Sequence, residues 1–505
     1  MNHIQTTFNE TDTNFSNEAN KNDKDIININ KDIKKIIYYR INNDNMKLNN
    51  IYNRYNSFIN KNTKKDNQNK KNIVLFKKER LFILMIVLFL LNINGILCES
   101  YIILKINKAG RYKILYNGGV ENIENPCHIV PNHTPTKMII NENEIDTSTR
   151  EYNFIYPYNT VKLYYEDSKE DFKCLFYGCS DIDEIDVSNL ITSNVNYMYY
   201  MFHGCSSLTS LILSNFNTQG VTSMRSMFGL CSSLTSIDVS SFITSSLIDM
   251  ANMFEGCSKL SSINLSNFET SNVLSMDSLF KGCSSLTTLD ISNLKTSKVN
   301  WMSAMFKDCY LLTTIDLSNF ITSSVNFFNS MFEGCKSLTS LELSNFNTEK
   351  AIKMQAMFNG CYNLKYLDIH NFDTSLVIDM SWMFNDCSSL ESLNIINFNT
   401  ANVENMRIMF GNCSSLTTLD SNNFDTSKVE NMGWMFENCL SLESIDLTSF
   451  NTSKVVNMRI MFGNCISLTT INLIHFDVSI VTDVGWMFQQ CRNLTYLNLS
   501  TIISD

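Results

Sequence analysis

The sequence predicts an α/β repeat solenoid, in which stacked units place parallel strands on one side and short helices on the other. Three observations predict it. Thirteen cysteines recur every 26 residues without an insertion, a Phe stands three residues before each of them, and no proline follows Pro157. A fixed period between about 20 and 50 residues is typical of solenoids. We expect about twelve to thirteen repeats over residues 179–505. The ladder cysteines are Cys179, Cys205, Cys231, Cys257, Cys283, Cys309, Cys335, Cys361, Cys387, Cys413, Cys439, Cys465 and Cys491.

Residues 1–80 form a basic, Asn-rich segment. They contain 16 Lys/Arg, 9 Asp/Glu and 20 Asn, so their net charge is +7 and the rest of the chain carries −17 of the total of −10. Because this segment has few apolar side chains to bury, we expect it to be disordered. The acidic charge of the remaining residues argues against a nucleic-acid partner, since binding to phosphates needs clustered Lys and Arg.

The stretch Leu81–Cys98 contains 18 residues without a charge. Roughly 20 apolar residues span the hydrocarbon core of a bilayer, so we expect a membrane helix here. Lys77, Lys78 and Arg80 precede it, and positive charge concentrates on the cytosolic side of membrane segments. The sequence therefore predicts a transmembrane signal anchor, with a cytosolic tail before it and residues 99–505 extracellular at the cell surface. A cleaved signal peptide is the alternative.

Residues 99–178 lack the 26-residue period. The stretch YIILKINKAGRYKILY alternates apolar and polar residues as a hairpin does, and VKLYYE indicates a further strand. A solenoid needs a terminal element that covers its first unit, so we expect a small β-rich N-terminal cap. Cys127 and Cys174 lie outside the ladder, and both a disulfide between them and two free thiols are compatible with the sequence.

The spacing inside one repeat predicts its local structure, with positions counted from the preceding ladder cysteine. In the unit that follows Cys257, positions 6 and 8 are Ile263 and Leu265, and this alternation predicts a short strand. Apolar residues at positions 16, 19, 22 and 23 are spaced by three and four, which predicts a short helix. Thr270 and Ser271 stand where the hydroxyl of a helix N-cap is expected.

The recurring Phe and Cys residues predict two internal ladders that face a shared core. Disulfides are the alternative, since exported Cys-rich chains usually form them. However, thirteen is an odd number, and neighbouring helices would hold the Cα atoms about 8–10 Å apart, beyond the roughly 7 Å that a disulfide bridges. We therefore expect free, buried cysteines. No second ligand type recurs with the period, so we expect neither a metal nor another cofactor. Asn occupies position 10 in nine of twelve units and is expected to bond turn backbone between units.

The repeat closely resembles that of the BspA-like leucine-rich-repeat surface proteins, in the variant first catalogued as a mycoplasma domain of unknown function. The stretches LTSLELSNFNTEK and CSSLTTLDISNLKTSKV carry the resemblance, which covers about two thirds of the chain. Its departures are Ser421, Ala351, Phe328 and Val478. The resemblance implies a right-handed leucine-rich-repeat-like solenoid on a cell surface, associated with adhesion, and no catalytic residues. The last unit stops after its strand, at YLNLSTIISD, which we interpret as a truncated gene model or a lost C-terminal cap.

Position 7 of the predicted strand faces outward and is acidic in most repeats. Parallel strands lie about 4.8 Å apart, so we expect these residues to stack into an acidic stripe flanked by Ser and Thr at positions 5 and 9. Since helices pack more widely than strands, we also expect the array to curve with this face on its concave side. The ligand-face candidates are Asp186, Asp238, Asp290, Asp316, Glu342, Asp368, Asp420 and Asp446.

The stripe supports more than one function. The favoured hypothesis is a membrane-anchored surface protein that mediates adhesion or binds an unknown protein or glycan through the exposed strands. A structural or variable coat spacer without a specific ligand is the alternative, because any solvated face needs small polar residues, and closely spaced carboxylates are also compatible with Ca²⁺. An enzyme is not expected, since a translational repeat offers no unique place where unlike groups converge. A His–Asp or Cys–His pair within about 3.2 Å would argue for catalysis.

Overall fold

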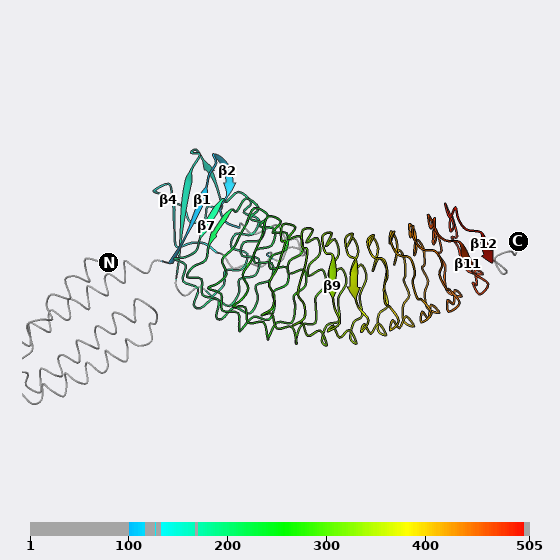
Figure 1. Ribbon diagram of the computed structural model, residues 1–505. Helices are drawn as coiled ribbons and strands as arrows, with labels where there is room; N and C mark the ends of the chain where they lie inside the picture. Colours follow the sequence, from blue (N-terminus) through cyan, green and yellow to red (C-terminus); the bar gives the residue numbers. More distant parts are fainter. Residues whose placement is uncertain (1–99, 117–126, 128–132, 167–169, 499–505) are drawn as a thin grey trace, which may run out of the picture. The chain divides into compact units, whose positions relative to one another are not determined.

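The structure, a computed structural model, describes residues 100–116, 127, 133–166 and 170–498, all within one structural unit. Figure 1 shows the coils of the repeat array (residues 170–498) stacked in a row behind an N-terminal sheet. The predicted tail and the predicted membrane segment Leu81–Cys98 lie outside the described residues. Among the residues that are described, no helix is long and apolar enough to cross a membrane.

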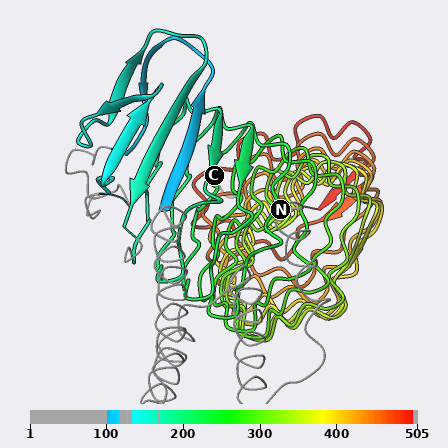
Figure 2. The ribbon, with the colours of Figure 1, turned by 90° about the vertical axis from the view of Figure 1, so that its left-hand side faces the viewer.

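Six strands form the largest sheet, which joins the N-terminal segment to the first coils. Its order is β4-β3-β6-β1-β7-β8, and Figure 2 shows the antiparallel strands standing at one end of the array. The central strands bury every second side chain, as the alternating sequence predicts. The strands are β1 (Ser100–Ile106), β3 (Lys137–Ile140), β4 (Asn143–Ile145), β6 (Asn159–Tyr165), β7 (Glu184–Asp186) and β8 (Ser210–Ile212).

Strand β1 is the junction between this sheet and the array. On one side it pairs antiparallel with β6, and on the other it pairs antiparallel with β7, the strand of the first coil. Strand β7 in turn pairs parallel with β8. A separate hairpin-like pair, β2 (Gly110–Lys113) with β5 (Glu151–Phe154), completes the N-terminal region. Since β1 hydrogen-bonds to β7, the first coil has no open sheet edge on that side.

In the array, parallel strand pairing is present but discontinuous. Strand β9 (Ser340–Glu342) pairs with β10 (Tyr366–Asp368), and β11 (Thr470–Asn472) pairs with β12 (Tyr496–Asn498), each with a register of 26 residues. A second line of contacts, at position 18, is continuous: single parallel bridges link each coil to the next from Asp171 to Asp483. A repeat solenoid is thus present, with short strands on one side of its coils.

The predicted helices are absent, because the described residues contain strands and turns but no helix. In one coil, the N–H groups of Met276, Ser278 and Phe280 donate to carbonyls of the next coil, at 2.8–3.0 Å. Between them, the Leu279 N–H donates to the Met276 carbonyl three residues earlier, and the Asp277 N–H donates to the Ser275 hydroxyl oxygen. An α-helix needs every amide to bond four residues back within its own segment. The segment therefore folds as successive turns, and positive φ angles of 53° at Ser278 and 72° at Gly282 interrupt any helical run.

The expected N-cap at Thr270 is also wrong, and its hydroxyl has another partner. Thr270 is fully buried. Its hydroxyl donates to the Lys295 carbonyl of the next coil at 2.9 Å and accepts from the Lys295 N–H at 2.7 Å. Both bonding capacities of the buried hydroxyl are used between coils, which satisfies the backbone of the next coil rather than the end of a helix.

The predicted core ladders are present. Rings of consecutive ladder phenylalanines stack with centroids 5.4–6.0 Å apart from Phe176 to Phe488. The thirteen ladder cysteines are free, as predicted, and all but Cys491 are buried. The reason given for free thiols, a separation of about 8–10 Å between packed helices, was wrong, since these segments are not helices and hydrogen-bond directly to the next coil. Instead each thiol from Cys205 onward donates to the carbonyl of the Phe 29 residues earlier, at 2.9–3.3 Å.

The structure decides between the alternatives left open for Cys127 and Cys174, and it confirms the expectation for the asparagines at position 10. Cys127 and Cys174 form a disulfide with a Cα–Cα distance of 6.0 Å. The position-10 amides link consecutive coils: Asn267 Nδ2, for example, donates to the carbonyls of Ser240 and Phe242. The strand face was expected to be concave because helices pack more widely than strands. Since the described residues contain no helix, this reason does not apply.

Candidate functional site: the strand face

The eight candidate carboxylates lie at the outer surface of the coils, on the strand face (positions 5–9 of each repeat). Asp186 and Asp368 are half-buried, and the other six are exposed. The row is interrupted at Ile212, which pairs with Asp186 in the β7–β8 register and is 45% exposed. Because each coil contributes one residue to this row, neighbouring members come from sequence positions 26 or 52 apart.

The sequence analysis missed a structural role of these carboxylates. Oδ1 of each aspartate accepts a hydrogen bond from the N–H two residues later, closing an Asx turn at the end of the strand segment. Asn264, Asn394 and Asn472 close the same turn with their side-chain oxygens. Position 7 holds Asp in some repeats and Asn in others, and this interchange could have predicted the turn. The hydrogen bond that closes the turn has N···O distances of 2.8–3.2 Å at seven aspartates: Asp186, Asp238, Asp290, Asp316, Asp368, Asp420 and Asp446.

These turns favour the ionised carboxylate. At Asp238 and Asp290 the Ser hydroxyl two residues on, followed by its backbone N–H, lowers the pKa below the ordinary value of 3.8. At Asp316 and Asp446 the backbone N–H is the first cause and the hydroxyl the second. A carboxylate that accepts hydrogen bonds is stabilised in its charged form. Glu342 differs, since its carboxylate accepts from the Tyr366 hydroxyl at 3.1 Å instead of closing a turn.

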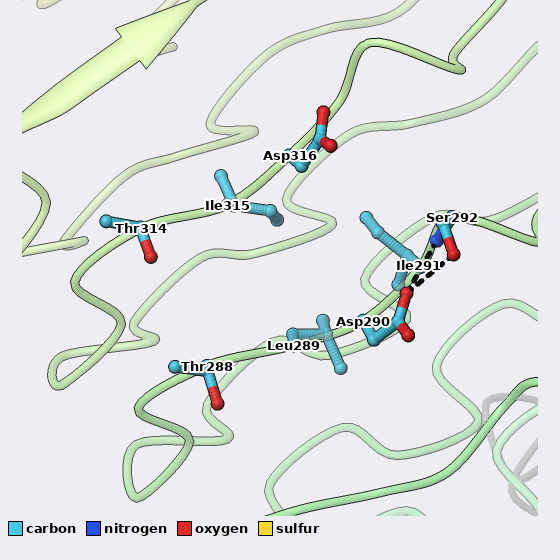
Figure 3. Close-up of a pocket in the computed structure, with 8 residues that line it drawn as sticks. All are labelled: Thr288, Leu289, Asp290, Ile291, Ser292, Thr314, Ile315 and Asp316. Atoms are coloured by element: carbon cyan, nitrogen blue, oxygen red, sulfur yellow. Dashed lines mark hydrogen bonds between the residues drawn. The ribbon is translucent and has the colours of Figure 1, made fainter.

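Asp290 and Asp316 are brought together at a hollow of about 440 Å³ between two neighbouring coils. Figure 3 shows the two segments running side by side, with Asp290 hydrogen-bonded to Ser292. The negative charge of Asp316 opposes the lowering of the Asp290 pKa, which indicates that the two groups influence each other. The residues that line the hollow are Thr288, Leu289, Asp290, Ile291, Ser292, Thr314, Ile315 and Asp316.

The hollow opens where the sheet is not paired. The N–H of Thr313 donates to the Thr287 carbonyl at 3.2 Å, and beyond this bond the described backbone has no strand pairing between 288–292 and 314–316. Carboxylates, hydroxyls and aliphatic side chains therefore surround a space whose backbone is not paired as a sheet. This combination suits a ligand with both polar and apolar surface.

Two observations bear on metal and catalytic chemistry. In the described part of the chain, no group of three or more His, Cys, Asp or Glu side chains is arranged to hold a metal ion. The structure contains a His–Asp pair of the kind that would argue for catalysis, since His370 Nδ1 lies 2.6 Å from Asp368 Oδ1. No Ser, Thr or Cys side chain in the described residues bonds the other ring nitrogen of His370. The pair lacks a nucleophile, which a hydrolytic triad requires.

Comparison with solved structures gives weak overall similarity to proteins of the leucine-rich-repeat class. A leucine-rich repeat protein from Eubacterium ventriosum ATCC 27560 is 14% identical, with a TM-score of 0.27, over 64% of this chain and 80% of its own. TLR13 in a TLR13–ssRNA13 complex is 15% identical, with a TM-score of 0.15, over 64% of this chain and 65% of its own. At such TM-scores the likeness carries no argument, and the fold rests on this chain's own coils.

Sequence comparison identifies the family. No curated protein matches the chain significantly. A family described as "Mycoplasma protein of unknown function, DUF285" matches in four overlapping segments, residues 170–263, 258–366, 339–442 and 417–501. Together these segments cover the whole repeat array and well over half of the chain. The chain therefore belongs to this DUF285 family of mycoplasma proteins.

Proposed function

We propose that the chain is a surface-displayed binding protein whose strand face contacts a protein or glycan ligand in adhesion. The observation that carries the proposal is the hollow between Asp290 and Asp316, where unpaired backbone, two carboxylates, hydroxyls and aliphatic groups converge. Repeat solenoids commonly bind along extended faces of this kind. The resemblance to BspA-like surface proteins supports the same proposal.

Display at the surface is part of the proposal. The uncharged stretch Leu81–Cys98 would anchor the chain, and Lys77, Lys78 and Arg80 would keep the preceding tail in the cytosol. Protease added to intact cells is expected to remove the repeats and to spare a tag placed at the N-terminus. The reverse cleavage pattern would reject this orientation.

A spacer or coat without a specific ligand is the competing proposal, and one observation favours it. Because the carboxylates close Asx turns, their recurrence needs no ligand to explain it. Catalysis forms no part of either proposal, since His370 and Asp368 lack a nucleophile among the described residues.

Two double variants separate these proposals. Asp290→Asn with Asp316→Asn removes both charges of the hollow, while the amide oxygen keeps each turn closed, as Asn264 does in its own coil. Asp420→Asn with Asp446→Asn is the matched control, because these residues also lie in neighbouring coils and close the same turns. We expect binding of the full-length chain to a panel of immobilised glycans and extracellular proteins to fall in the first variant only.

Stability must be measured beside binding. Each double variant is expected to stay within about 0.5 kcal/mol of the parent, the usual tolerance of surface sites. Unchanged binding together with unchanged melting would leave the spacer proposal standing. A calcium site makes a different forecast, since a chelator would then lower the melting temperature of the parent.

A further inference from the structure

Arginine occurs at position 20 in three coils, and in two of them a carboxylate of the next coil neutralises it. Arg225 Nε donates to Asp249 Oδ2 at 2.9 Å, and Arg459 Nη1 donates to Asp483 Oδ2 at 3.3 Å. Both aspartates occupy position 18 of the following repeat. The third arginine is Arg407, and the corresponding residue of its neighbouring coil is an asparagine.

That asparagine, Asn431, replaces the acceptor with a donor. Its Oδ1 accepts from the Gly433 N–H at 3.0 Å, closing the same turn that Asp249 and Asp483 close with their own Oδ1 atoms. Since the oxygen is fixed by the turn, the atom equivalent to the second carboxylate oxygen is Nδ2. The coils of Asp249 and Asp483 present a carboxylate oxygen, an acceptor, to their arginines. The coil of Asn431 presents an N–H donor in the same place.

The Arg407 guanidinium is held between two tryptophan rings. Its central carbon lies 5.4 Å from the Trp382 ring centroid and 4.7 Å from that of Trp434. In the described residues it forms no ion pair, and neither Glu404 nor Glu430, the carboxylates nearest to it and to Asn431 in sequence, contacts it. Cation–π stacking covers the two faces of a guanidinium but leaves the N–H groups at its edge, which lie in the plane.

The tryptophans stand at positions where the backbone disfavours large side chains. Both have φ of +61°, in the left-handed region, and the same position of the repeat holds Ser226, Asn252 or Ala304 in some coils and Tyr200, Ile408 or Ile460 in others. A bulky residue with positive φ is uncommon and costs conformational energy. The two rings are half-buried and border the guanidinium of one arginine.

We propose that Arg407 and Asn431 form a binding site for the carboxylate of an external ligand, bordered by Trp382 and Trp434. The chain itself indicates the ligand chemistry, because an aspartate carboxylate fills the equivalent place beside Arg225 and Arg459. A planar carboxylate also matches the fork of a guanidinium through two parallel hydrogen bonds. The site lies at positions 18–21 of the repeat, apart from the strand face, so it stands independently of the function proposed above.

Titration of the full-length chain with the α-amide of N-acetylaspartate and with glucuronate tests the site, with the α-amide of N-acetylasparagine and glucose as neutral controls. Tryptophan fluorescence and the NMR signal of the Arg407 side chain report binding. Both acids are expected to bind saturably, with Kd on the order of millimolar for a single charge-assisted contact. A preference for either acid indicates whether a sugar acid or an acidic side chain is the source, and both results support the site.

Variants decide whether this site is the one responsible. Arg407→Gln is expected to weaken binding about tenfold or more. Asn431→Asp supplies an internal carboxylate and is expected to abolish binding while the fold is kept, as in the coils of Asp249 and Asp483. Arg459→Gln is the matched control and should leave binding unchanged, whereas Asp483→Asn should open a second site and double the stoichiometry.

Three results would overturn the proposal. One is the absence of carboxylate binding to the parent chain, and another is binding that survives Asn431→Asp. The third is inorganic sulfate binding as tightly as either acid, because the site would then recognise negative charge rather than a planar carboxylate.

Discussion

In the N-terminal sheet, Ser100 pairs with Tyr165 across a long chain separation, and the Cys127–Cys174 disulfide closes a further loop. In the array, each coil bonds only to the coils before and after it, with a register of 26 residues. The sheet therefore depends on contacts distant in sequence, whereas the array adds up contacts between neighbours. The difference predicts that damage to a coil stays local, while damage to the sheet spreads through the N-terminal region.

The largest effect is expected for a ring of the core ladder. Phe306 is fully buried, with centroids 6.0 Å from Phe280 and 5.6 Å from Phe332. Phe306→Ala should lower the free energy of unfolding by about 3–5 kcal/mol, the usual loss for a buried aromatic residue. Hydrogen exchange should show faster opening in the adjacent coils only. Equal loss of protection in β1 and β6 would contradict the local character of the array, and Phe327→Ala, at a half-exposed ring, is the milder control.

Removal of the disulfide should come next. Cys127→Ser with Cys174→Ser frees a loop with a sequence separation of 47, and a loss of about 2–4 kcal/mol is expected. The effect should appear as faster hydrogen exchange in the N-terminal sheet and leave the middle coils unchanged. Reductant applied to the parent should reproduce the result, because the ladder thiols are already free. Loss of protection throughout the array would show that the sheet and the coils unfold together.

A ladder cysteine should matter less. Cys309→Ala removes a small buried group and its hydrogen bond to the Phe280 carbonyl, so a local loss of about 1–2 kcal/mol is expected. Burial raises the pKa of the Cys309 thiol to about 12, which keeps it protonated near neutral pH. Alkylating reagents should therefore modify the buried ladder thiols, which are all but Cys491, only after denaturation. Non-reducing mass spectrometry that found bridges between successive coils would refute this.

The smallest effect concerns acid. The folded-state pKa values of Asp238, Asp290, Asp316 and Asp446 lie below the ordinary 3.8. Their contribution to stability is therefore complete above pH 3.8 and disappears as the pH falls through the lower, folded-state values. Melting temperature should drop slightly as the pH falls below about 3.8, and the array should account for the drop. The four Asn substitutions together should flatten this dependence, since their amides do not titrate.

Much of the array was predictable from sequence because its signals are local and repeated. The 26-residue period gave the register, the Phe and Cys spacing identified the residues that face the core, and the Asn at position 10 was rightly assigned to turns between coils. For the candidate site, sequence placed Asp290 and Asp316 at the surface. It missed the turns that they close and the hollow between them, since both depend on backbone geometry at the strand ends.

The sequence alone determined the repeat and its inward side chains, because each follows from a residue type at a fixed position. The tertiary structure decided what the second half of each coil becomes. Apolar residues spaced by three and four suit both a helix and a series of turns, and the choice depends on where the amides bond. Every second amide donates to a carbonyl 25 residues further on, as that of Ser278 does to Ser303. Too few amides then remain for the hydrogen bonds of a helix. The stacking of Arg407 on Trp434 likewise exists only because neighbouring coils lie in contact.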